Sequence, residues 1–307
     1  MKADAVFEGG GVRGIGHVGA VQVLEEQGYE WNKLAGNSAG SIVAALLASG
    51  FSGKELIGIM NDLDYQKILG DTWLDNIPLV GKGLELGFQF GIHDNDYLEK
   101  WIENLLAKKN IHTFADLPDD NLKIIASDVT NGRMIIFPDS LDYYGIPKEK
   151  MSIAKAVRMS SSIPFFFKPI KWETSKNVCY IVDGGLLSNY PVDIFDRSDG
   201  LPRWPTFGFR LSQEKIRSKP AEIDGPITFG KAIVRTMYQA HDIRHVDKHS
   251  EVRTIFIPTG TIPSTKFSLS ESDQEFLYES GYHAAQKFLE SWDFEEYKRK
   301  YRGINDN

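Results

Sequence analysis

A serine between two glycines is the first residue whose surroundings point to chemistry. Ser38 stands in GNSAG, which matches the pattern G-x-S-x-G with Gly36 and Gly40. In that pattern a tight turn from a strand into a helix exposes the serine oxygen, and the glycines remove the Cβ clashes that such a turn creates. The alternative is an ordinary serine at the N-terminus of a helix, and this motif alone leaves both interpretations open.

A glycine-rich loop, GGGVRG at residues 9–14, precedes this serine. It satisfies G-x-G-x-x-G, but a dinucleotide site also needs an acid at the end of the second strand, where the sequence reads LAGNS. Successive glycines also let backbone N–H groups turn toward an anion without side chains in the way, which would make the loop an oxyanion hole. Arg13 is placed to hold this loop or to stabilise negative charge nearby.

A carboxylate, Asp183, ends the apolar stretch VCYIVD and is followed by Gly184 and Gly185. Strands of a parallel sheet end on the side where ligands bind, so an aspartate here is expected to reach a serine that follows a neighbouring strand. The competing interpretation is a plain turn, because Asp-Gly is a turn signal.

The α/β-hydrolases also carry G-x-S-x-G, but their nucleophile follows several strands, and only one strand is expected before Ser38. They also need a histidine late in the chain. The late histidines all fall on expected helices, so we interpret them as surface or core-edge residues: His241, His245, His249 and His283. His17, one turn past the glycine loop, is assigned to packing or orientation.

Three motifs in this order, GGGVRG, GNSAG and DGG, resemble the patatin-like phospholipases, also called patatin-like lipid acyl hydrolases. The serine-rich segment AVRMSSSIPFFFKP at residues 156–169 resembles the family's stretch before the aspartate, and the likeness covers about residues 3–211. The resemblance implies a Ser–Asp dyad, with Ser38 as the nucleophile and Asp183 as the general base, and needs no histidine. The oxyanion hole that it implies comprises Gly9, Gly10, Gly11, Arg13 and Gly14.

The reaction expected from this resemblance is hydrolysis of a fatty-acyl ester of a phospholipid or an acylglycerol. Asp183 would accept the Ser38 proton during attack on the ester carbonyl, and water would then release the fatty acid from acyl-Ser38. No metal or other cofactor is expected. Two alternatives stay open, namely a non-catalytic lipid- or nucleotide-binding module on the same fold and a nicotinamide oxidoreductase.

The elements that must position these residues alternate between strand and helix. Apolar periodicity predicts strands at residues 3–8 and 33–36, with a helix after each glycine motif. This order, together with the resemblance, predicts an α/β fold, a three-layer sandwich with a mostly parallel central sheet flanked by helices. Further strands are expected at LKIIASDV, RMIIFP, VCYIVD, TFGFRL and VRTIFIP, and further helices from Asp96, from Ser152, over 227–249 and after Ser270.

The 307 residues are divided into a catalytic core at 1–211 and a C-terminal helical extension at 212–307, packed on the same domain. The glycine-rich stretch 75–92 is a candidate lid or an irregular packed segment. The aromatic residues 165–167 either line an acyl-chain pocket or meet a bilayer, or else fill a corner of the core.

Composition limits the partners. A net charge of −7 argues against nucleic acid, which needs a basic surface. The single cysteine, Cys179, excludes an internal disulfide and favours a cytoplasmic location. No signal peptide or membrane-spanning stretch is expected, so any membrane contact would be peripheral. The basic KRKYR near the C-terminus is either a solvated helix end or a contact with acidic lipid head groups.

Overall fold

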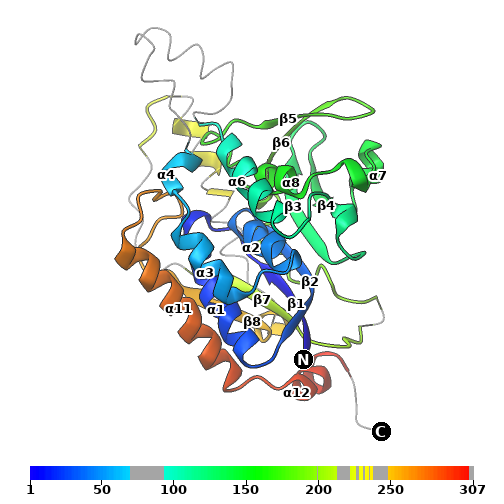
Figure 1. Cartoon of the computed structure of the whole chain (residues 1–307), viewed down its shortest axis with the longest axis vertical. Coiled ribbons are helices and arrows are strands. Elements are labelled where there is room, and N and C mark those ends of the chain that lie inside the picture. Colours follow the sequence, from blue (N-terminus) through cyan, green and yellow to red (C-terminus); the bar gives the residue numbers. More distant parts are fainter. Residues whose placement is uncertain are drawn as a thin grey trace.

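The computed structural model describes residues 1–69, 93–198, 200–212, 222–225, 228–230, 232–234, 236–237 and 248–303. It contains a sheet with helices packed against it (Figure 1). The strands are β1 (Lys2–Phe7), β2 (Glu30–Asn37), β3 (Leu122–Asp128), β4 (Arg133–Phe137), β5 (Ile170–Glu173), β6 (Val178–Asp183), β7 (Thr206–Ser212) and β8 (Thr254–Pro258). The α-helices are α1 (Ile15–Glu26), α2 (Ala39–Ala48), α3 (Gly53–Asn61), α4 (Tyr65–Ile68), α6 (Asp96–Ala107), α7 (Leu141–Tyr144), α8 (Ile153–Ser160), α10 (Lys248–Glu251), α11 (Glu271–Leu289) and α12 (Phe294–Tyr301). The short 3₁₀-helices are η1 (Gly11–Gly14), η3 (Phe114–Asp116), η4 (Lys148–Lys150) and η5 (Gly184–Leu186).

The sheet has the strand order β5-β6-β3-β2-β1-β7-β8, and β4 pairs with β3 beside this path. The neighbouring strands β3, β2, β1, β7 and β8 pair in parallel. Strands β4, β5 and β6 join the sheet through antiparallel pairings. Helices α1 and α2 each follow a parallel strand and lie against the sheet (Figure 1). The expected α/β class, a central sheet flanked by helices with further helices at the C-terminus, is confirmed.

Strands β2 and β6 meet end to end along one edge of β3. Because β4 pairs with residues 124–128 of β3, β2 and β6 must share the other edge. On that edge Asn37 of β2 lies opposite Ile125, and Asp183 of β6 lies opposite Ala126. The two strands therefore run toward each other and stop at consecutive residues of β3, about 3.3 Å apart along the strand.

The direction of β6 corrects one expectation. Sequence reasoning treated Asp183 as the end of a parallel strand, but β6 is antiparallel to β3. A strand that runs antiparallel to β3 would normally end level with the start of the parallel strands, not with their carboxyl ends. Here β6 pairs with β3 only through its last three residues and stops level with the end of β2, so Asp183 still lies beside the turn that follows β2.

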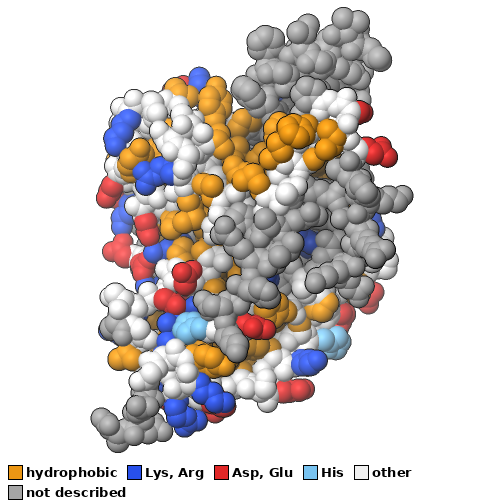
Figure 2. Space-filling model, turned by 180° about the vertical axis from the view of Figure 1, so that it is seen from behind, with side chains coloured by type: hydrophobic (Ala, Val, Ile, Leu, Met, Phe, Trp, Pro, Cys, Tyr) orange, Lys and Arg blue, Asp and Glu red, His pale blue; other side chains and the backbone are white. Residues whose placement is uncertain are grey.

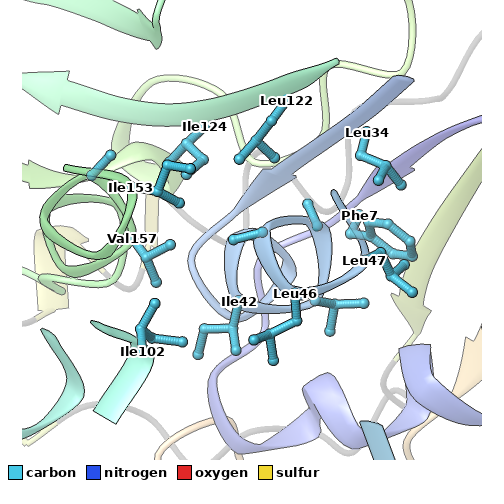
Figure 3. Packing of buried hydrophobic residues seen from close by; sticks show 14 of the residues in the cluster. Phe7, Leu34, Ile42, Leu46, Leu47, Ile102, Leu122, Ile124, Ile153 and Val157 are labelled. Carbon is cyan, nitrogen blue, oxygen red and sulfur yellow. The ribbon is translucent and has the colours of Figure 1, made fainter. Parts of the chain in front are cut away.

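The main hydrophobic core surrounds α2, whose residues from Ala39 to Leu47 are all buried. In Figure 3, Ile42 and Leu46 of this helix project among apolar side chains from the strands and neighbouring helices, Ile102, Val157 and Phe7 among them. A helix that is apolar all round needs such complete enclosure. The turn that precedes α2 is therefore attached to one of the least mobile parts of the core.

A smaller apolar cluster lies on the other face of the sheet, because side chains alternate between faces along a strand. It comprises Val6, Ala35 and Ile125, with Tyr190 and Ile194 packed against it. The chain that follows β6 thus crosses this second face. That crossing brings residues 188–190 close to the ends of β1 and β2, as the contacts described below show.

The C-terminal part of the chain is built into the same sheet and core. Strand β8 pairs with β7 as a parallel neighbour. Helix α11 begins after Ser270, as the sequence predicts, is capped by that residue, and packs closely on α1. A Cβ placed on Gly281 would lie only 1.8 Å from the carbonyl oxygen of Gly16, so the two helix backbones meet where no side chain fits.

Some expectations concern residues that are not described. The candidate lid at 75–92 lies outside the described residues. Of the predicted helix 227–249, residues 228–230, 232–234 and 236–237 are helical and α10 begins at Lys248, while the remaining positions lie outside the described residues.

The basic run near the C-terminus lies in α12, where its lysines pair with acids of the same helix. Lys298 is 2.6 Å from Glu295, and Lys300 pairs with Glu296. This arrangement matches a solvated, charge-balanced helix end. Among the described helices, none is both long enough and apolar enough to cross a bilayer.

Candidate active site

Ser38 occupies a strained turn between β2 and α2. Its backbone has φ 51° and ψ −124°, a conformation that costs a residue with a side chain about 1–3 kcal/mol. Although Ser38 stands at the N-cap position of α2, its side chain makes no capping hydrogen bond, and the residue is 5% exposed. The hydroxyl therefore does not cap the N-terminus of α2, in contrast to that of an ordinary capping serine.

The glycines on either side of Ser38 sit where a side chain cannot fit. A Cβ on Gly36 would lie 2.2 Å from the carbonyl oxygen of Gly40. A Cβ on Gly40 would lie 2.4 Å from the carbonyl oxygen of Phe7, at the end of β1. The turn is thus closed onto itself and pressed against β1, which brings Ser38 beside the loop that follows β1.

That loop lies directly against the serine. A Cβ on Gly9 would be 3.0 Å from Cβ of Ser38. Within the described part of the chain, the backbone N–H groups of Gly10 and Gly11 find no acceptor. Two adjacent donors without an acceptor, next to a strained serine, are suited to bind an oxyanion.

Neighbouring contacts hold the loop in place. The Arg13 side chain is bound to the loop itself, because its Nε donates to the carbonyl oxygen of Gly10 at 3.2 Å. The N–H of Val12 donates to the carbonyl oxygen of Ser264 at 3.1 Å. Gly14 lies against Ala39, the residue after the serine. In this geometry Arg13 and Gly14 support the loop, while Gly10 and Gly11 carry the available N–H groups.

Asp183 is completely buried at the end of β6. Its Oδ1 accepts the N–H of Gly185 at 2.7 Å, which fixes the carboxylate at the start of η5. Gly184 lies so close to the end of β2 that a Cβ would be 2.4 Å from Oδ1 of Asn37, the residue before Ser38. The carboxylate-bearing turn and the serine-bearing turn are thus in direct contact.

The C-terminal end of α8 holds the backbones of both residues. Oγ of Ser160 accepts the N–H of Ser38 at 2.8 Å and donates to the carbonyl oxygen of Ile125 at 2.6 Å. Two residues later, the carbonyl oxygen of Ser162 accepts the N–H of Asp183 at 2.9 Å. The serine-rich segment recognised in the sequence therefore sets the spacing between the two turns.

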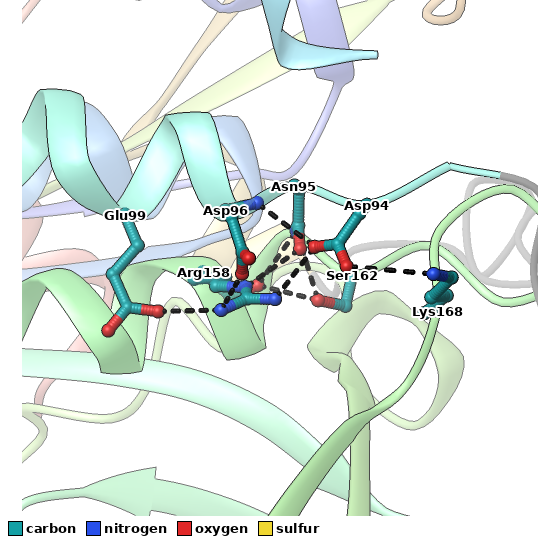
Figure 4. Close-up of polar contacts among 7 residues, drawn as sticks. All are labelled: Asp94, Asn95, Asp96, Glu99, Arg158, Ser162 and Lys168. Atoms are coloured by element: carbon teal, nitrogen blue, oxygen red, sulfur yellow. Dashed lines mark hydrogen bonds and ion pairs between the residues drawn. The ribbon is translucent and has the colours of Figure 1, made fainter. Parts of the chain in front are cut away.

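An ionic cluster fastens this segment to the start of α6 (Figure 4). Arg158 donates to Asp94 and Glu99, both at 2.9 Å, and to Oδ1 of Asn95 at 3.0 Å, and it also pairs with Asp96. Nδ2 of Asn95 donates to Oγ of Ser162 at 3.1 Å. A guanidinium held by several partners is far more constrained than a single surface ion pair, so the end of α8 is rigidly placed.

An apolar pocket lies beside the serine. It contains about 540 Å³ of empty space, counted out to its open mouth. Its walls come from η1, α1, α2, α3, α4, α6, the segment after α8 and the segment between β8 and α11. They include Ser38, Ile42, Met60, Leu98, Phe167 and Phe267. Of the three aromatic residues 165–167, the last lines this pocket, and Phe166 stacks on Phe267 with ring centroids 5.3 Å apart.

His17 is buried beneath the glycine loop and does not reach the serine. Its Nε2 lies 2.9 Å from the carbonyl oxygen of Glu8, so Nε2 must carry the proton that this bond uses. Its ring packs edge-on against Phe7. Burial lowers the pKa of His17 to about 4, because the charged ring would lose its hydration.

This lowered pKa predicts a stability loss in acid. The unfolded chain takes up the His17 proton near pH 6.5, while the folded protein resists protonation until about pH 4, so folding stability falls as the pH drops through this window. The loss should approach about 3 kcal/mol at pH 4. Urea unfolding of the wild type and of His17→Gln at pH 7 and pH 4.5 measures it, and His17→Gln should show the flatter dependence.

The control for this experiment is His283→Gln on α11, because the His283 side chain is 71% exposed and its replacement removes a histidine without disturbing a buried site. An NMR titration of the His17 ring in the wild type gives an independent check. A ring that titrates near pH 6.5 would contradict the burial argument.

The other late histidines are not brought to the serine. The ring of His249 lies 5.6 Å from that of Tyr297 in α12, and His283 lies on the exposed side of α11 beside Glu279. His241 and His245 lie outside the described residues.

Sequence reasoning missed several buried polar residues around the site. Glu8, Asn37 and Asn189 are all buried. Glu8 directly precedes Gly9, and Asn37 directly precedes Ser38. Asn189 lies six positions after Asp183. For Glu8 and Asn37, a polar residue at the end of an apolar strand was the only available signal, and Asn in such a position is usually a turn residue. Asn189 follows no strand directly and carried no such signal.

Comparison with known proteins gives a consistent picture. A family model for patatin-like phospholipases matches residues 5–196. The uncharacterised protein YqhO of Bacillus subtilis is 38% identical over 295 residues, which are 96% of this chain and 100% of YqhO. The probable lipid hydrolase 463L of Invertebrate iridescent virus 6 is 27% identical over 62% of this chain and 61% of its own length.

Among solved structures, VipD from Legionella pneumophila superimposes with a TM-score of 0.58. The alignment covers 94% of this chain and 67% of VipD at 20% sequence identity. At that identity the likeness concerns the fold alone. It includes residues beyond the family match, which agrees with the C-terminal strand and helices being part of the same fold.

Proposed function

The chain belongs to the patatin-like phospholipase family, and from this premise we propose that it is a serine lipid acyl hydrolase that cleaves fatty-acyl esters of phospholipids or acylglycerols through Ser38 and Asp183. Membership of this family, together with a relative named as a probable lipid hydrolase, supports lipid hydrolysis in general. The dyad and the substrate are the finer parts of the proposal and are argued from the site.

One observation carries the proposal. The facing ends of β2 and β6 stop at consecutive residues of β3, so the turns that hold Ser38 and Asp183 touch each other. The Ser38 turn follows β2 and the Asp183 turn follows β6, two strands of opposite direction, and the serine turn lies against the loop that carries the N–H groups of Gly10 and Gly11. This combination supplies a nucleophile, a base and an anion site within one small volume.

The proposed mechanism follows from these positions. Asp183 takes the proton of the Ser38 hydroxyl as Oγ attacks the ester carbonyl carbon. The N–H groups of Gly10 and Gly11 stabilise the resulting oxyanion, and each such donor contributes about 3 kcal/mol in comparable sites. The leaving alcohol takes a proton from Asp183, and the same carboxylate then activates the water that hydrolyses acyl-Ser38.

The pocket supports a substrate with a long apolar chain. Its lining is almost entirely aliphatic and aromatic, and Ser38 forms part of its wall. Placement of an acyl chain there would put the ester carbonyl next to the serine. Each methylene of the acyl chain that moves from water into the pocket stabilises the complex by about 0.8 kcal/mol.

A substrate panel tests this proposal. Purified protein is incubated with diacyl phospholipids, lysophospholipids, triacylglycerols and p-nitrophenyl esters of increasing chain length, and released fatty acid or nitrophenol is measured. The proposal expects turnover, with long acyl chains preferred over acetate. Binding of lipid without any turnover would instead favour the alternative of a non-catalytic binding module.

We also propose peripheral contact with a lipid surface near the pocket. Phe229 and Ile233 are 54% and 45% exposed, and they are one helical turn apart. Between them, Gly230 lies against the ring of Phe165, two residues before the pocket residue Phe167. Figure 2 shows that hydrophobic side chains gather in the upper half of the face turned away in Figure 1.

This contact predicts a loss of vesicle binding. The double substitution of Phe229 and Ile233 by serine removes two apolar side chains from the lipid interface, and binding to phosphatidylcholine vesicles should weaken about tenfold. Co-sedimentation measures the bound fraction, and hydrolysis of a soluble p-nitrophenyl ester should stay at the wild-type rate. Phe276→Ser, on the exposed face of α11, serves as the control. Equal binding by all three proteins would contradict the proposal.

A further inference from the structure

We propose that Asn189 is a positioning residue that clamps the serine turn to the glycine loop through its side-chain amide. The inference rests on the proposed function of this site and adds residues that neither the motifs nor the proposed chemistry assign. Asn189 does not touch the reacting atoms. It acts through its two neighbours, which directly precede Ser38 and Gly9 in the sequence.

The amide of Asn189 bridges these neighbours. Nδ2 of Asn37 donates to Oδ1 of Asn189 at 2.9 Å. Nδ2 of Asn189 in turn donates to Oε1 of Glu8 at 3.3 Å. One side chain thereby links the residue before the nucleophile to the residue before the glycine loop.

Glu8 fixes the direction of this chain of hydrogen bonds. Its Oε2 accepts the N–H of Leu211 at 2.6 Å, and its Oε1 lies 3.4 Å from Nε of Arg210. A carboxylate paired in this way only accepts hydrogen bonds, so Asn189 must present its NH₂ group to Glu8 and its oxygen to Asn37. Reversal of the Asn189 amide would break both bonds.

The backbone of Asn189 supports the same loop. The N–H of Gly9 points to the carbonyl oxygen of Asn189 at 3.5 Å. A Cβ on Gly9 would lie 2.7 Å from Oδ1 of Asn189, so the loop passes directly over the amide. Asn37, Asn189 and Glu8 are all buried, and hydrogen bonds in such a dry network are costly to break.

Asn189 also lies on the segment that follows the base. Asn189 ends the turn that begins at Asp183, and the N–H of Ser188 donates to the carbonyl oxygen of Gly184 at 2.9 Å. The turn is therefore compact, and a shift of Asn189 would also displace the Asp183 carboxylate. The side chain of Asn189 thus joins the serine turn to the glycine loop, and its backbone belongs to the segment that carries the base.

The test begins with Asn189→Ala, which removes both amide bonds while the backbone stays. Loss of the clamp should displace the glycine loop relative to Ser38, and a displacement of about 1 Å can lower a catalytic rate about 100-fold. We expect kcat on a p-nitrophenyl ester to fall by about that factor while KM changes less than about threefold, because the apolar pocket contains neither asparagine.

A double-mutant cycle shows whether Asn189 acts through Asn37. Asn37→Ala removes only the bond between the two amides, so it is the milder change. If the residues act as one clamp, the double variant should be no slower than Asn189→Ala alone. Asn121→Ala is the matched control, since Asn121 likewise donates one hydrogen bond, to the carbonyl oxygen of Asn32, but at the opposite end of β2. Its kcat should equal that of the wild type.

Hydrogen–deuterium exchange on the same proteins separates a clamp from a general structural role and needs no substrate. In Asn189→Ala, amide exchange should rise in residues 8–14 and 36–40 and stay unchanged in α11. Three results would overturn the inference, namely an unchanged kcat, additive effects in the cycle, or faster exchange throughout the chain. If the wild type cleaves no ester but exchange still rises only in the two turns, the clamp stands and the proposed function fails.

Discussion

Replacement of Ser38 by alanine is expected to abolish ester hydrolysis, with kcat lowered by at least about 10⁴-fold. The reason is that Ser38 lines the apolar pocket and lies against the loop whose Gly10 and Gly11 N–H groups have no acceptor among the described residues. Loss of a nucleophile in comparable serine enzymes leaves only what binding and the oxyanion hole contribute. Release of nitrophenol from a long-chain ester gives the rate directly.

The control for this substitution is another serine at the start of a helix. Ser52 caps α3, and its Oγ accepts the N–H of Glu55, so it represents the ordinary capping role. Ser52→Ala should lower stability by about 1 kcal/mol and leave turnover unchanged. A Ser38→Ala protein that keeps more than a few per cent of wild-type kcat would exclude Ser38 as the nucleophile.

Replacement of Asp183 by asparagine is expected to lower kcat about 10³–10⁴-fold with little change in KM. The amide retains the shape of the side chain and the bond to the N–H of Gly185, but it cannot take the Ser38 proton. Such isosteric changes in other catalytic groups of this kind cost about 10⁴-fold. Steady-state kinetics on the same ester measure both constants.

Asp128 offers a matched control because it too is buried at the end of a strand and accepts backbone N–H groups, from Thr130 and Asn131. Asp128→Asn should reduce the free energy of unfolding and keep turnover within a few-fold of wild type. Equal losses of kcat in Asp128→Asn and Asp183→Asn would show that a buried carboxylate supports the fold at either place, and would remove Asp183 from the mechanism.

The local parts of the site could be predicted from the sequence because they depend on a few neighbouring residues. Glycines at 36 and 40 indicate a turn that excludes side chains, and the structure has carbonyl oxygens where their Cβ atoms would be. The glycine loop follows β1 for the same reason. The serine turn and the glycine loop each depend on residues that are neighbours in the sequence, so residue pattern and spacing suffice to predict them.

The relation between Ser38 and Asp183 could be expected only from the resemblance. The sequence reasoning placed Asp183 on a parallel strand, and the direction of β6 proved that reason wrong. Strand direction and register depend on pairing between distant segments, and no local pattern encodes which edge of β3 receives which strand. The short strand β5, four residues long, was missed for a similar reason.

The polar support of the site was hidden for a different reason. Asn37, Asn189 and Arg158 look like surface or turn residues one at a time, since nothing in their neighbours shows that they are buried or partnered. Their roles arise from contacts across 63 to 181 residues of sequence. Only the folded arrangement brings their donors and acceptors together.

The central claim, that Ser38 attacks with the help of Asp183, is tested most directly by the site and rate of covalent labelling. Wild type, Ser38→Ala and Asp183→Asn are treated with a long-chain fluorophosphonate, and peptide mass spectrometry locates the adduct over time. The account predicts one adduct on Ser38 in the wild type, none in Ser38→Ala, and labelling slowed by at least about 100-fold in Asp183→Asn. An adduct on a different residue, or equal labelling rates in the wild type and Asp183→Asn, would contradict it.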